Sequence, residues 1–278
     1  METERAMVRV AAMSDVHYGK TSQGVLQRTF AELSERADVL ALCGDLTDYG
    51  LAEEARLLAK DITASLKIPI VAVLGNHDYE SNEQEEIVDV LRGAGVTLLD
   101  GDATEVRGVG FAGVKGFAGG FGRGALGPWG EAATKAFVHE AINEALKLES
   151  ALARLRTVSR IAILHYAPIC ETVEGEPEQI WPYLGSSRLE EPLGRFEVTA
   201  VFHGHAHKGC PEGKTKSGVP VYNVALPLMR ARFPDEPPYR LLEVEVEVTP
   251  HPSRRSTDVG PAGAALSPDG ATRRRPTP

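Results

Sequence analysis

The chain has 278 residues, with 39 acidic and 30 basic side chains and a formal net charge of −9. Its hydrophobic content of 42% and charged content of 25% are those of an ordinary globular protein, which excludes disorder as the main state. Residues 251–278 carry five arginines and two aspartates, a net +3 that leaves −12 for the rest. A body this acidic repels a phosphodiester polymer, so long nucleic acid is not expected as a partner.

The three cysteines are Cys43, Cys170 and Cys210, an odd number without the C-x-x-C spacing of a metal site. Free thiols are therefore expected. The first residues have no apolar segment behind a basic one, and no uninterrupted apolar run approaches the ~20 residues that span a bilayer. These features predict a cytoplasmic protein with no membrane partner. Nothing in the sequence predicts an oligomeric state.

Short apolar runs alternate with longer amphipathic segments in the N-terminal part of the chain. This alternation is typical of β-α-β units around a mostly buried sheet. Strands are expected at residues 8–13, 39–42 and 70–74, and helices at 25–37, 52–66 and 83–92.

The character of the sequence changes to β from about residue 96. A strand pair is expected at 105–114, a glycine-rich stretch covers 116–130, and further strands are expected at 161–164, 198–202 and 243–248. Residues 131–155 are rich in Ala, Glu, Leu and Lys without Pro or Gly, which predicts the longest helix. The composition after residue 249 predicts a disordered tail, so we expect a folded domain over 1–250 and an Arg- and Pro-rich tail over 251–278.

Five of the apolar runs lead directly into residue types that bind metals. In chain order these residues are Asp15 and His17, then Asp45, then Asn76 with His77, then His165, and last His205 and His207. In an open α/β sheet the loops at the carboxyl ends of the strands lie along one edge. We therefore expect these five segments to converge on one site.

The donor set explains which metals are expected. Two aspartates, one asparagine and four histidines without cysteine form a mixed oxygen and nitrogen set, which suits manganese, iron or zinc rather than calcium. Seven protein ligands exceed what one ion with open catalytic positions needs. The count predicts two divalent or mixed-valence ions that share one carboxylate.

The motifs read D-x-H at 15–17, G-D-x-x-D at 44–48, G-N-H-D at 75–78, a later His165, and G-H-x-H at 204–207. This ordered set resembles the binuclear metallophosphoesterases, also called calcineurin-like phosphoesterases, over about residues 8–248. The resemblance implies a four-layer α/β/β/α sandwich with a metallophosphoesterase domain over 1–250. It also implies metal-dependent hydrolysis of a small phosphate ester.

The resemblance further assigns roles to the residues of these motifs. It implies one metal held by Asp15, His17, Asp45 and His207, and a second held by Asp45, Asn76, His165 and His205. A hydroxide bridging the two ions would attack the phosphorus. His77 would act on the substrate as general acid or electrostatic stabiliser, and Asp78 would orient or polarise His77.

The motif details favour a phosphodiesterase. Protein phosphatases of this superfamily typically carry G-D-x-x-D-R-G and G-N-H-E, whereas here Tyr49 follows Asp48 and the third motif ends in Asp78. The pattern looks closer to the cyclic nucleotide phosphodiesterase-type branch. The alternatives are a phosphomonoesterase, a nucleotide pyrophosphatase, a nuclease, or a scaffold without catalysis. A nuclease would need a basic groove, and a scaffold tends to lose ligands, of which none is missing here.

Several of these residues also have ordinary structural interpretations. Taken alone, Asp15 is more often a helix cap, and Asp45 and Asn76 are common turn residues; their conjunction favours a metal site. His203 is expected to be a core residue or a support for the ligands rather than a ligand. The stretch 113–122 lacks a phosphate-loop pattern but is a candidate site wall. Residues 170–191 form either a substrate-facing lid or a surface loop packed on its own aromatic residues.

Overall fold

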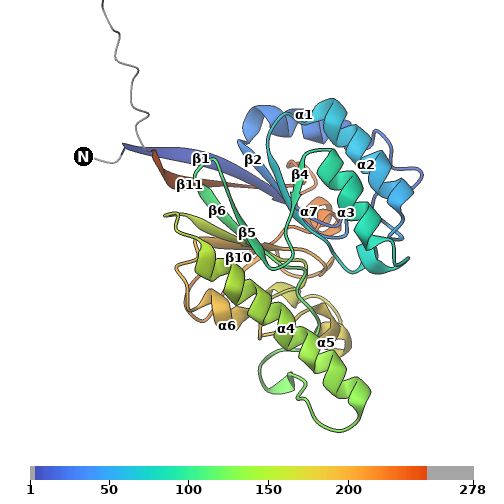
Figure 1. Cartoon of the computed structure of the whole chain (residues 1–278), viewed down its shortest axis with the longest axis vertical. Helices are drawn as coiled ribbons and strands as arrows, with labels where there is room; N and C mark the ends of the chain where they lie inside the picture. Colours follow the sequence, from blue (N-terminus) through green and yellow to red (C-terminus); the bar gives the residue numbers. More distant parts are fainter. Residues whose placement is uncertain (1–3, 249–278) are drawn as a thin grey trace, which may run out of the picture.

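The computed structural model describes residues 4–248. Two β-sheets lie face to face, and helices cover the outer face of each sheet (Figure 1). This order of layers is the α/β/β/α sandwich that the motif resemblance implies. The expected tail at 251–278 and the domain boundary at 250 lie outside the described residues.

The first sheet contains the N-terminal β-α-β units. Its strands, in spatial order, are β11 (Arg240–Val248), β1 (Glu4–Met13), β2 (Val39–Cys43), β3 (Ile70–Val73) and β4 (Val96–Leu98). Strands β1 to β4 run parallel, and β11 runs antiparallel along β1. The carboxyl ends of β1, β2 and β3 therefore lie side by side at one edge.

The second sheet is also mainly parallel. Its order is β5 (Asp102–Val106), β6 (Val109–Gly113), β7 (Arg160–Ile163), β8 (Ala200–His203), β10 (Pro220–Asn223) and β9 (Glu212–Lys214). The predicted strand pair is the hairpin of β5 and β6, whose two turn residues, Arg107 and Gly108, have φ of 56° and 81°. Positive φ at both positions is the geometry of a tight hairpin turn.

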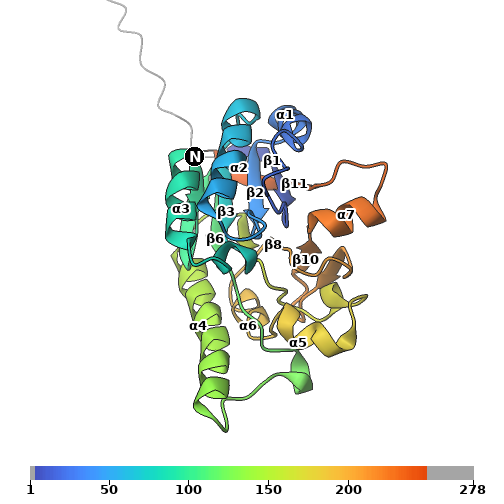
Figure 2. The same cartoon turned by 90° about the vertical axis from the view of Figure 1, so that its right-hand side faces the viewer.

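The helices divide between the two outer faces (Figures 1 and 2). The first sheet is covered by α1 (Gln27–Arg36), α2 (Ala52–Ser65) and α3 (Gln84–Gly93), and the second by α4 (Ala132–Arg154) and α6 (Glu190–Leu193). Two short helices remain. Helix α5 (Trp181–Leu184) lies in the connection between β7 and β8, and α7 (Leu226–Arg232) follows β10. None of the helices in the described part of the chain is both long and apolar enough to cross a bilayer.

The apolar core follows the alternation of side chains along each strand. On β1, Val8, Val10 and Ala12 point into the core between the sheets, whereas Ala11 and Met13 pack against the helices. Such runs are apolar on both faces, which is why the sequence shows them as continuous hydrophobic segments.

Several elements of the second half have no counterpart in the sequence-based prediction, among them β9, β10 and α7. Strands β9 and β10 are edge or near-edge strands that contain Gly213 and Pro220, residues that disfavour strands. Helix α7 is short and has a proline near its start. Pairing with β8 stabilises β10, and this contact is not visible in the local sequence.

Candidate metal centre

The seven predicted ligands converge at one edge of the two sheets. Each lies in a loop directly after a parallel strand, and the five strands concerned are β1, β2, β3, β7 and β8. Three close groups of possible ligands result. The possible ligand atoms within each group lie within 4.8 Å of one another. The groups are Asp15 with His17 and His207, Asp45 with His165 and His205, and His17 with Asp45 and His77.

The first cluster comprises Asp15, His17 and His207. Asp15 is buried, and its Oδ1 lies 2.9 Å from Nε2 of His207. The backbone N–H of His205 also donates to both oxygens of Asp15, at 3.1 and 3.0 Å. These contacts fix the carboxylate between the loop after β1 and the loop after β8.

The second cluster comprises Asp45, His165 and His205, with Asn76 beside it. Nδ1 of His165 donates to the carbonyl of Cys43 at 2.9 Å, so Nε2 is the nitrogen of the neutral ring that is free to bind a metal. Nε2 faces Oδ1 of Asn76 at 2.9 Å and Oδ1 of Asp45 at 3.3 Å. In the same way, Nε2 of His205 donates to the carbonyl of Tyr183 at 3.2 Å, which leaves Nδ1 of His205 for the cluster.

Asp45 belongs to the second cluster and also faces the first. Its Oδ1 faces His165, and its Oδ2 lies 3.8 Å from Nε2 of His17. The backbone N–H of His77 donates to Oδ1 at 2.9 Å and fixes the carboxylate. Asp45 is thus the residue whose two oxygens point to different clusters, as a bridging ligand requires.

The local backbone explains why glycines flank the ligands. A Cβ on Gly44 would lie 2.6 Å from Nδ1 of His165, and Gly44 has a φ of 89°. Asp15, His17, Asp45 and His205 also have positive φ, between 42° and 68°. Such conformations cost free energy for residues other than glycine, and they concentrate where function requires a particular side-chain direction.

The chemistry of the cluster fits metal ions. Both ring nitrogens of His17 are buried and have no hydrogen-bond partner among the described residues. When the His165 ring is neutral, its Nε2 is an acceptor that faces the oxygens of Asn76 and Asp45, at 2.9 and 3.3 Å. Buried acceptors that converge in this way are unfavourable unless a cation or proton lies among them.

The pKa values agree with this arrangement. Burial alone would raise the pKa of Asp45, but the charge and hydrogen bond of His165 hold it well below its usual range. Burial would lower the pKa of His165, and Asp45 raises it to about 9. Burial lowers the pKa of His205 to about 4. The Asp45 carboxylate is therefore ionised, which is the form that binds a metal.

His77 lies beside both clusters, and its side chain is more exposed than those of His17 and Asp45. Its side chain is 37% exposed, compared with 21% for His17 and 1% for Asp45. Nδ1 of His77 lies 2.7 Å from the backbone carbonyl of Asp48, which can only accept a hydrogen bond. The ring centres of His77 and His17 are 4.6 Å apart. His77 is thus held at the cluster with Nε2 left for another partner.

Asp78 is placed differently from the expectation that it orients His77. Its buried carboxylate accepts hydrogen bonds from the backbone N–H groups of Gly75, Leu46 and Thr47 and from the Thr47 hydroxyl. Burial, together with the charge of Asp45, raises its pKa to about 6. Asp78 therefore joins the loops after β2 and β3. The contact with the His77 ring that was expected of Asp78 is made instead by the backbone carbonyl of Asp48.

Two further residues support the histidine loop after β8. His203 is buried, and its Nε2 pairs with the hydroxyl of Thr172 at 2.8 Å, so it lies behind the ligands as expected. Asn223 at the end of β10 donates to the carbonyl of Ala206 at 2.8 Å. Asn223 was not predictable from the sequence, because its partner is a backbone atom in a distant loop.

The two segments left open by the sequence both border the cluster. In the stretch 113–122, the backbone carbonyl of Lys115 accepts from the N–H of His165 at 3.0 Å, so this stretch lies against the loop that carries His165. Residues 170–191 contribute the Tyr183 carbonyl to His205 and pack Val173 and Leu184 against Ala206. This segment is therefore packed on the histidine loop.

Comparison with known proteins agrees with the fold and the motifs. The family model of the calcineurin-like phosphoesterases matches residues 8–209, and the chain belongs to this family. The structure of TT1561 of Thermus thermophilus is similar with a TM-score of 0.53 and 16% identity, over 86% of this chain and 99% of that one. Another solved structure has a TM-score of 0.55 and 16% identity, over 79% of this chain and 91% of that one. No curated protein matches the sequence.

Proposed function

We propose that the protein is a phosphodiesterase that hydrolyses small diesters such as cyclic nucleotides with two bound metal ions of manganese, iron or zinc. The observation that carries the proposal is the position of Asp45, which presents one oxygen to each of two ligand clusters. When bound, two metal ions supply Lewis acidity, because they acidify water and offset the charge on phosphoryl oxygens.

The ligand residues have distinct tasks in this proposal. Asp15, His17 and His207 would hold one ion, and Asn76, His165 and His205 the other, with Asp45 shared by both. Carbonyl oxygens of Cys43 and Tyr183 fix the rings of His165 and His205 and thereby select the nitrogen that ligates. Ligands fixed in this way need little reorganisation on metal binding.

His77 would supply the proton of the reaction. The Asp48 carbonyl holds its Nδ1–H, so Nε2 is the nitrogen that carries a second proton when the ring is charged. A proton at Nε2 is placed to go to the oxygen of the departing alcohol. General acids of this kind contribute typically ~10²–10⁴-fold to the rate.

The charges around the clusters favour a diester over a monoester. All the ion pairs that Asp15 and Asp45 form within residues 4–248 are with histidines. Tyr49, which stands where protein phosphatases of this superfamily have arginine, is 58% exposed. A diester carries one negative charge and needs fewer cations than a monoester dianion.

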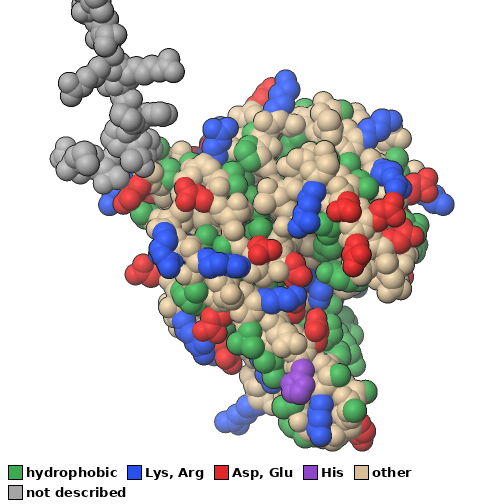
Figure 3. Space-filling model, in the orientation of Figure 1, with side chains coloured by type: hydrophobic (Ala, Val, Ile, Leu, Met, Phe, Trp, Pro, Cys, Tyr) green, Lys and Arg blue, Asp and Glu red, His purple; other side chains and the backbone are tan. Residues whose placement is uncertain are grey.

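The surface charge also bears on the alternative of a nuclease. On the face seen in Figure 3, side chains of both signs are interspersed rather than gathered in a basic band. A nuclease gains most of its affinity from rows of Lys and Arg along the phosphate backbone. The net charge of −12 over residues 1–250 also repels such a polymer, so we propose a small substrate.

The test is hydrolysis of a substrate panel by metal-stripped protein before and after reloading with manganese. The panel comprises cyclic nucleotides, dinucleoside polyphosphates, aryl diesters, aryl monoesters and single-stranded DNA. We expect diester hydrolysis only after reloading, and none by the Asp45→Asn variant. Reloaded wild-type protein that hydrolyses no diester would contradict the proposal.

A further inference from the structure

The peptide group between Asp48 and Tyr49 has a hydrogen-bond partner at each end. Its carbonyl oxygen accepts from Nδ1 of His77 at 2.7 Å, and its N–H donates to Oε2 of Glu54 at 2.9 Å. A trans peptide group is planar and rigid, so its N–H and C=O point in opposite directions. The carboxylate that fixes the N–H therefore also fixes the carbonyl that holds the histidine ring.

Glu54 lies in the first turn of α2, where a glutamate commonly accepts a hydrogen bond from the N–H at the helix start. Here the N–H groups of Asp48 and Tyr49 are closer to its Oε2, at 3.1 and 2.9 Å, than the N–H of Leu51, at 3.4 Å. Glu54 is also buried, with 1% exposure, whereas Glu53 beside it is exposed. The main contact of Glu54 is therefore with the loop after β2 rather than with its own helix.

The charge of Glu54 acts on this loop. Within residues 4–248, all the hydrogen bonds of its carboxylate are to backbone N–H groups. Hydrogen bonds to an ionised acceptor are about twice as strong as those between neutral groups. A negative charge at the N–H end of a peptide group also polarises it, so that its carbonyl oxygen becomes a better acceptor. Glu54 thus both directs and strengthens the acceptor that holds His77.

The His77 ring depends on this acceptor for its orientation. Within residues 4–248, the contact with the Asp48 carbonyl is the only hydrogen bond of the ring. Oε2 of Glu80, on an exposed side chain, lies 3.5 Å from the same Nδ1 and is a competing acceptor. If the carbonyl turns away, the ring can rotate toward Glu80, and its Nε2 moves with it.

The loop after β2 packs directly on the 3-10 helix η1 (His77–Tyr79). Gly50 has a φ of 67°, and a Cβ there would lie 2.6 Å from the carbonyl oxygen of His77. The hydroxyl of Ser81 donates to the carbonyl of Tyr49 at 2.6 Å. These contacts hold the two segments together, so a change in the peptide group reaches the ring.

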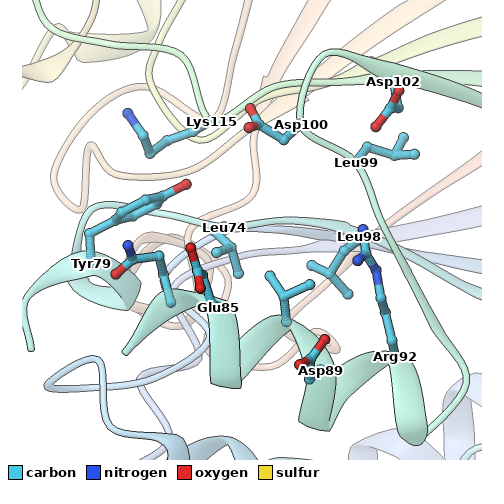
Figure 4. Close-up of a pocket in the computed structure, with 12 residues that line it drawn as sticks. Leu74, Tyr79, Glu85, Asp89, Arg92, Leu98, Leu99, Asp100, Asp102 and Lys115 are labelled. Carbon is cyan, nitrogen blue, oxygen red and sulfur yellow. The ribbon is translucent and has the colours of Figure 1, made fainter. Parts of the chain in front are cut away.

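The other end of η1 takes no part in this arrangement. Tyr79 contributes its ring to a pocket of about 400 Å³ beside α3, where Nζ of Lys115 lies 5.5 Å from the ring centre (Figure 4). Neither His77 nor Glu54 lines this pocket. The orientation of the His77 ring is therefore set from the loop after β2.

We propose that Glu54 is a positioning residue of the reaction, which acts through the peptide group of Asp48 and Tyr49 to keep Nε2 of His77 facing the departing alcohol. None of the hydrogen bonds of the Glu54 carboxylate within residues 4–248 reaches one of the seven predicted metal ligands. This inference rests on the proposed phosphodiesterase function, in which His77 supplies the proton.

The experiment replaces Glu54 in the manganese-loaded enzyme. Glu54→Met keeps the length of the side chain without an acceptor, and Glu54→Gln keeps one acceptor oxygen without the charge. For diesters with a poor leaving group, kcat should fall about ten- to a hundredfold in Glu54→Met, as expected for a displaced catalytic group, and less in Glu54→Gln. Aryl diesters that need no protonation should be hydrolysed nearly as by the wild type, and the metal content should be unchanged.

The matched control is Glu83→Met. Oε2 of Glu83 accepts from the N–H of Ala52 at 2.8 Å, so it supports the start of the same helix. Its contact is not with the peptide group of Asp48 and Tyr49. We therefore expect Glu83→Met to leave the dependence of kcat on the leaving group as it is in the wild type.

A double variant separates positioning from general support of the fold. In the His77→Ala background, Glu54→Met should not slow hydrolysis further, because the ring that Glu54 positions is gone. A further loss in the double variant, a uniform loss across leaving groups or a fall in metal content would overturn the inference. If Glu54→Met does not fold, Glu54→Gln is judged by the same criteria, and wild-type rates with poor leaving groups in Glu54→Gln would also overturn it.

NMR of zinc-loaded protein with isotope-labelled histidines tests the same link without catalysis. At a pH at which the ring is neutral, His77 of the wild type should carry its proton on Nδ1, and the His77→Ala variant identifies its signal. In Glu54→Met the ring should show a mixture of tautomers, and an unchanged tautomer would contradict the inference while diester hydrolysis still supports a phosphodiesterase. If the tautomers mix but the wild type hydrolyses no diester, the proposed function fails and the link between Glu54 and His77 stands.

Discussion

The backbone carbonyl oxygen of Asp48 lies 2.7 Å from Nδ1 of His77. Because a carbonyl only accepts hydrogen bonds, this contact fixes the tautomer of the neutral ring and leaves Nε2 for proton exchange. The contact uses the backbone of Asp48 and therefore does not depend on the Asp48 side chain. The orientation of His77 is thus set by the fold of the loop after β2.

The His77→Ala variant should slow hydrolysis strongly for diesters with a poor leaving group and only mildly for aryl diesters. An alkoxide must be protonated as it leaves, whereas a nitrophenolate need not be. The measurement is kcat for a series of leaving groups of different pKa, with metal content determined in parallel. A uniform loss across the series together with reduced metal content would instead make His77 a metal ligand, which its distance to Asp45 and His17 also permits.

The Asp45→Asn variant should abolish turnover and lower metal occupancy more than Asp48→Asn does. Asp45 presents oxygens to both clusters, whereas within residues 4–248 the Asp48 carboxylate faces one histidine of the site, at 3.5 Å from Nδ1 of His17. Metal analysis after reloading and gel filtration is the measurement. Asp48→Asn is the matched control, since it makes the same chemical change in the same loop. Full activity of purified Asp45→Asn would remove the hypothesis of a shared carboxylate.

The sequence was sufficient to predict which side chains converge at one edge, because each of them directly follows an apolar strand. The strand fixes where Asp45 or His165 begins its loop, so a local pattern carries the information. The contacts of Asp48 and Asn223 were not predictable, because one uses a backbone carbonyl and the other reaches a loop far away in the chain. The role of Asp78 was also not apparent, since its hydrogen bonds are to backbone N–H groups.

The Gly44→Ala variant should destabilise the protein and weaken metal binding. Gly44 has a φ of 89°, and a Cβ there would lie 2.6 Å from Nδ1 of His165. The unfavourable backbone conformation alone costs about 1–3 kcal/mol. The control is Gly93→Ala at the end of α3, where a Cβ would meet no atom within 4 Å. Urea denaturation and metal analysis should show both losses for Gly44→Ala and neither for Gly93→Ala.

The Asp61→Ala variant should reduce stability in a pH-dependent way. The buried Asp61 carboxylate accepts hydrogen bonds from Tyr18, Gly24 and Gln27 at 2.7, 2.6 and 2.8 Å. Burial alone would raise the pKa of Asp61, but these hydrogen bonds hold it below its usual value. Its contribution is therefore complete above the unfolded pKa of about 3.9 and is lost as the pH falls through the lower folded pKa.

At neutral pH, Asp61→Ala should lower the free energy of unfolding by about 1–3 kcal/mol, because buried donors lose their acceptor. Urea denaturation over a series of pH values measures this difference, which should shrink in acid. Glu105→Ala is the control, since Glu105 is exposed on β5. A difference of constant size down to the acid limit of the folded state would show that the charge of Asp61 contributes nothing.

The enzyme should prefer diesters to monoesters of equal leaving-group quality. A monoester is close to a dianion at neutral pH and requires cations beyond two metal ions and His77. Three cations lie in the loops at 113–123 and 170–191, namely Lys115, Arg123 and Arg188. Arg188 donates to the carbonyl of Leu126, and Arg123 lies in the exposed stretch after Phe121. Lys115 is the one beside the cluster, yet the ring of Tyr166 stands between them.

The measurement is kcat/KM for matched aryl monoester and diester substrates at the same manganese concentration. A monoester preference that is lost in Lys115→Met would mean that Lys115 reaches the phosphoryl group, and the protein would then be a phosphomonoesterase.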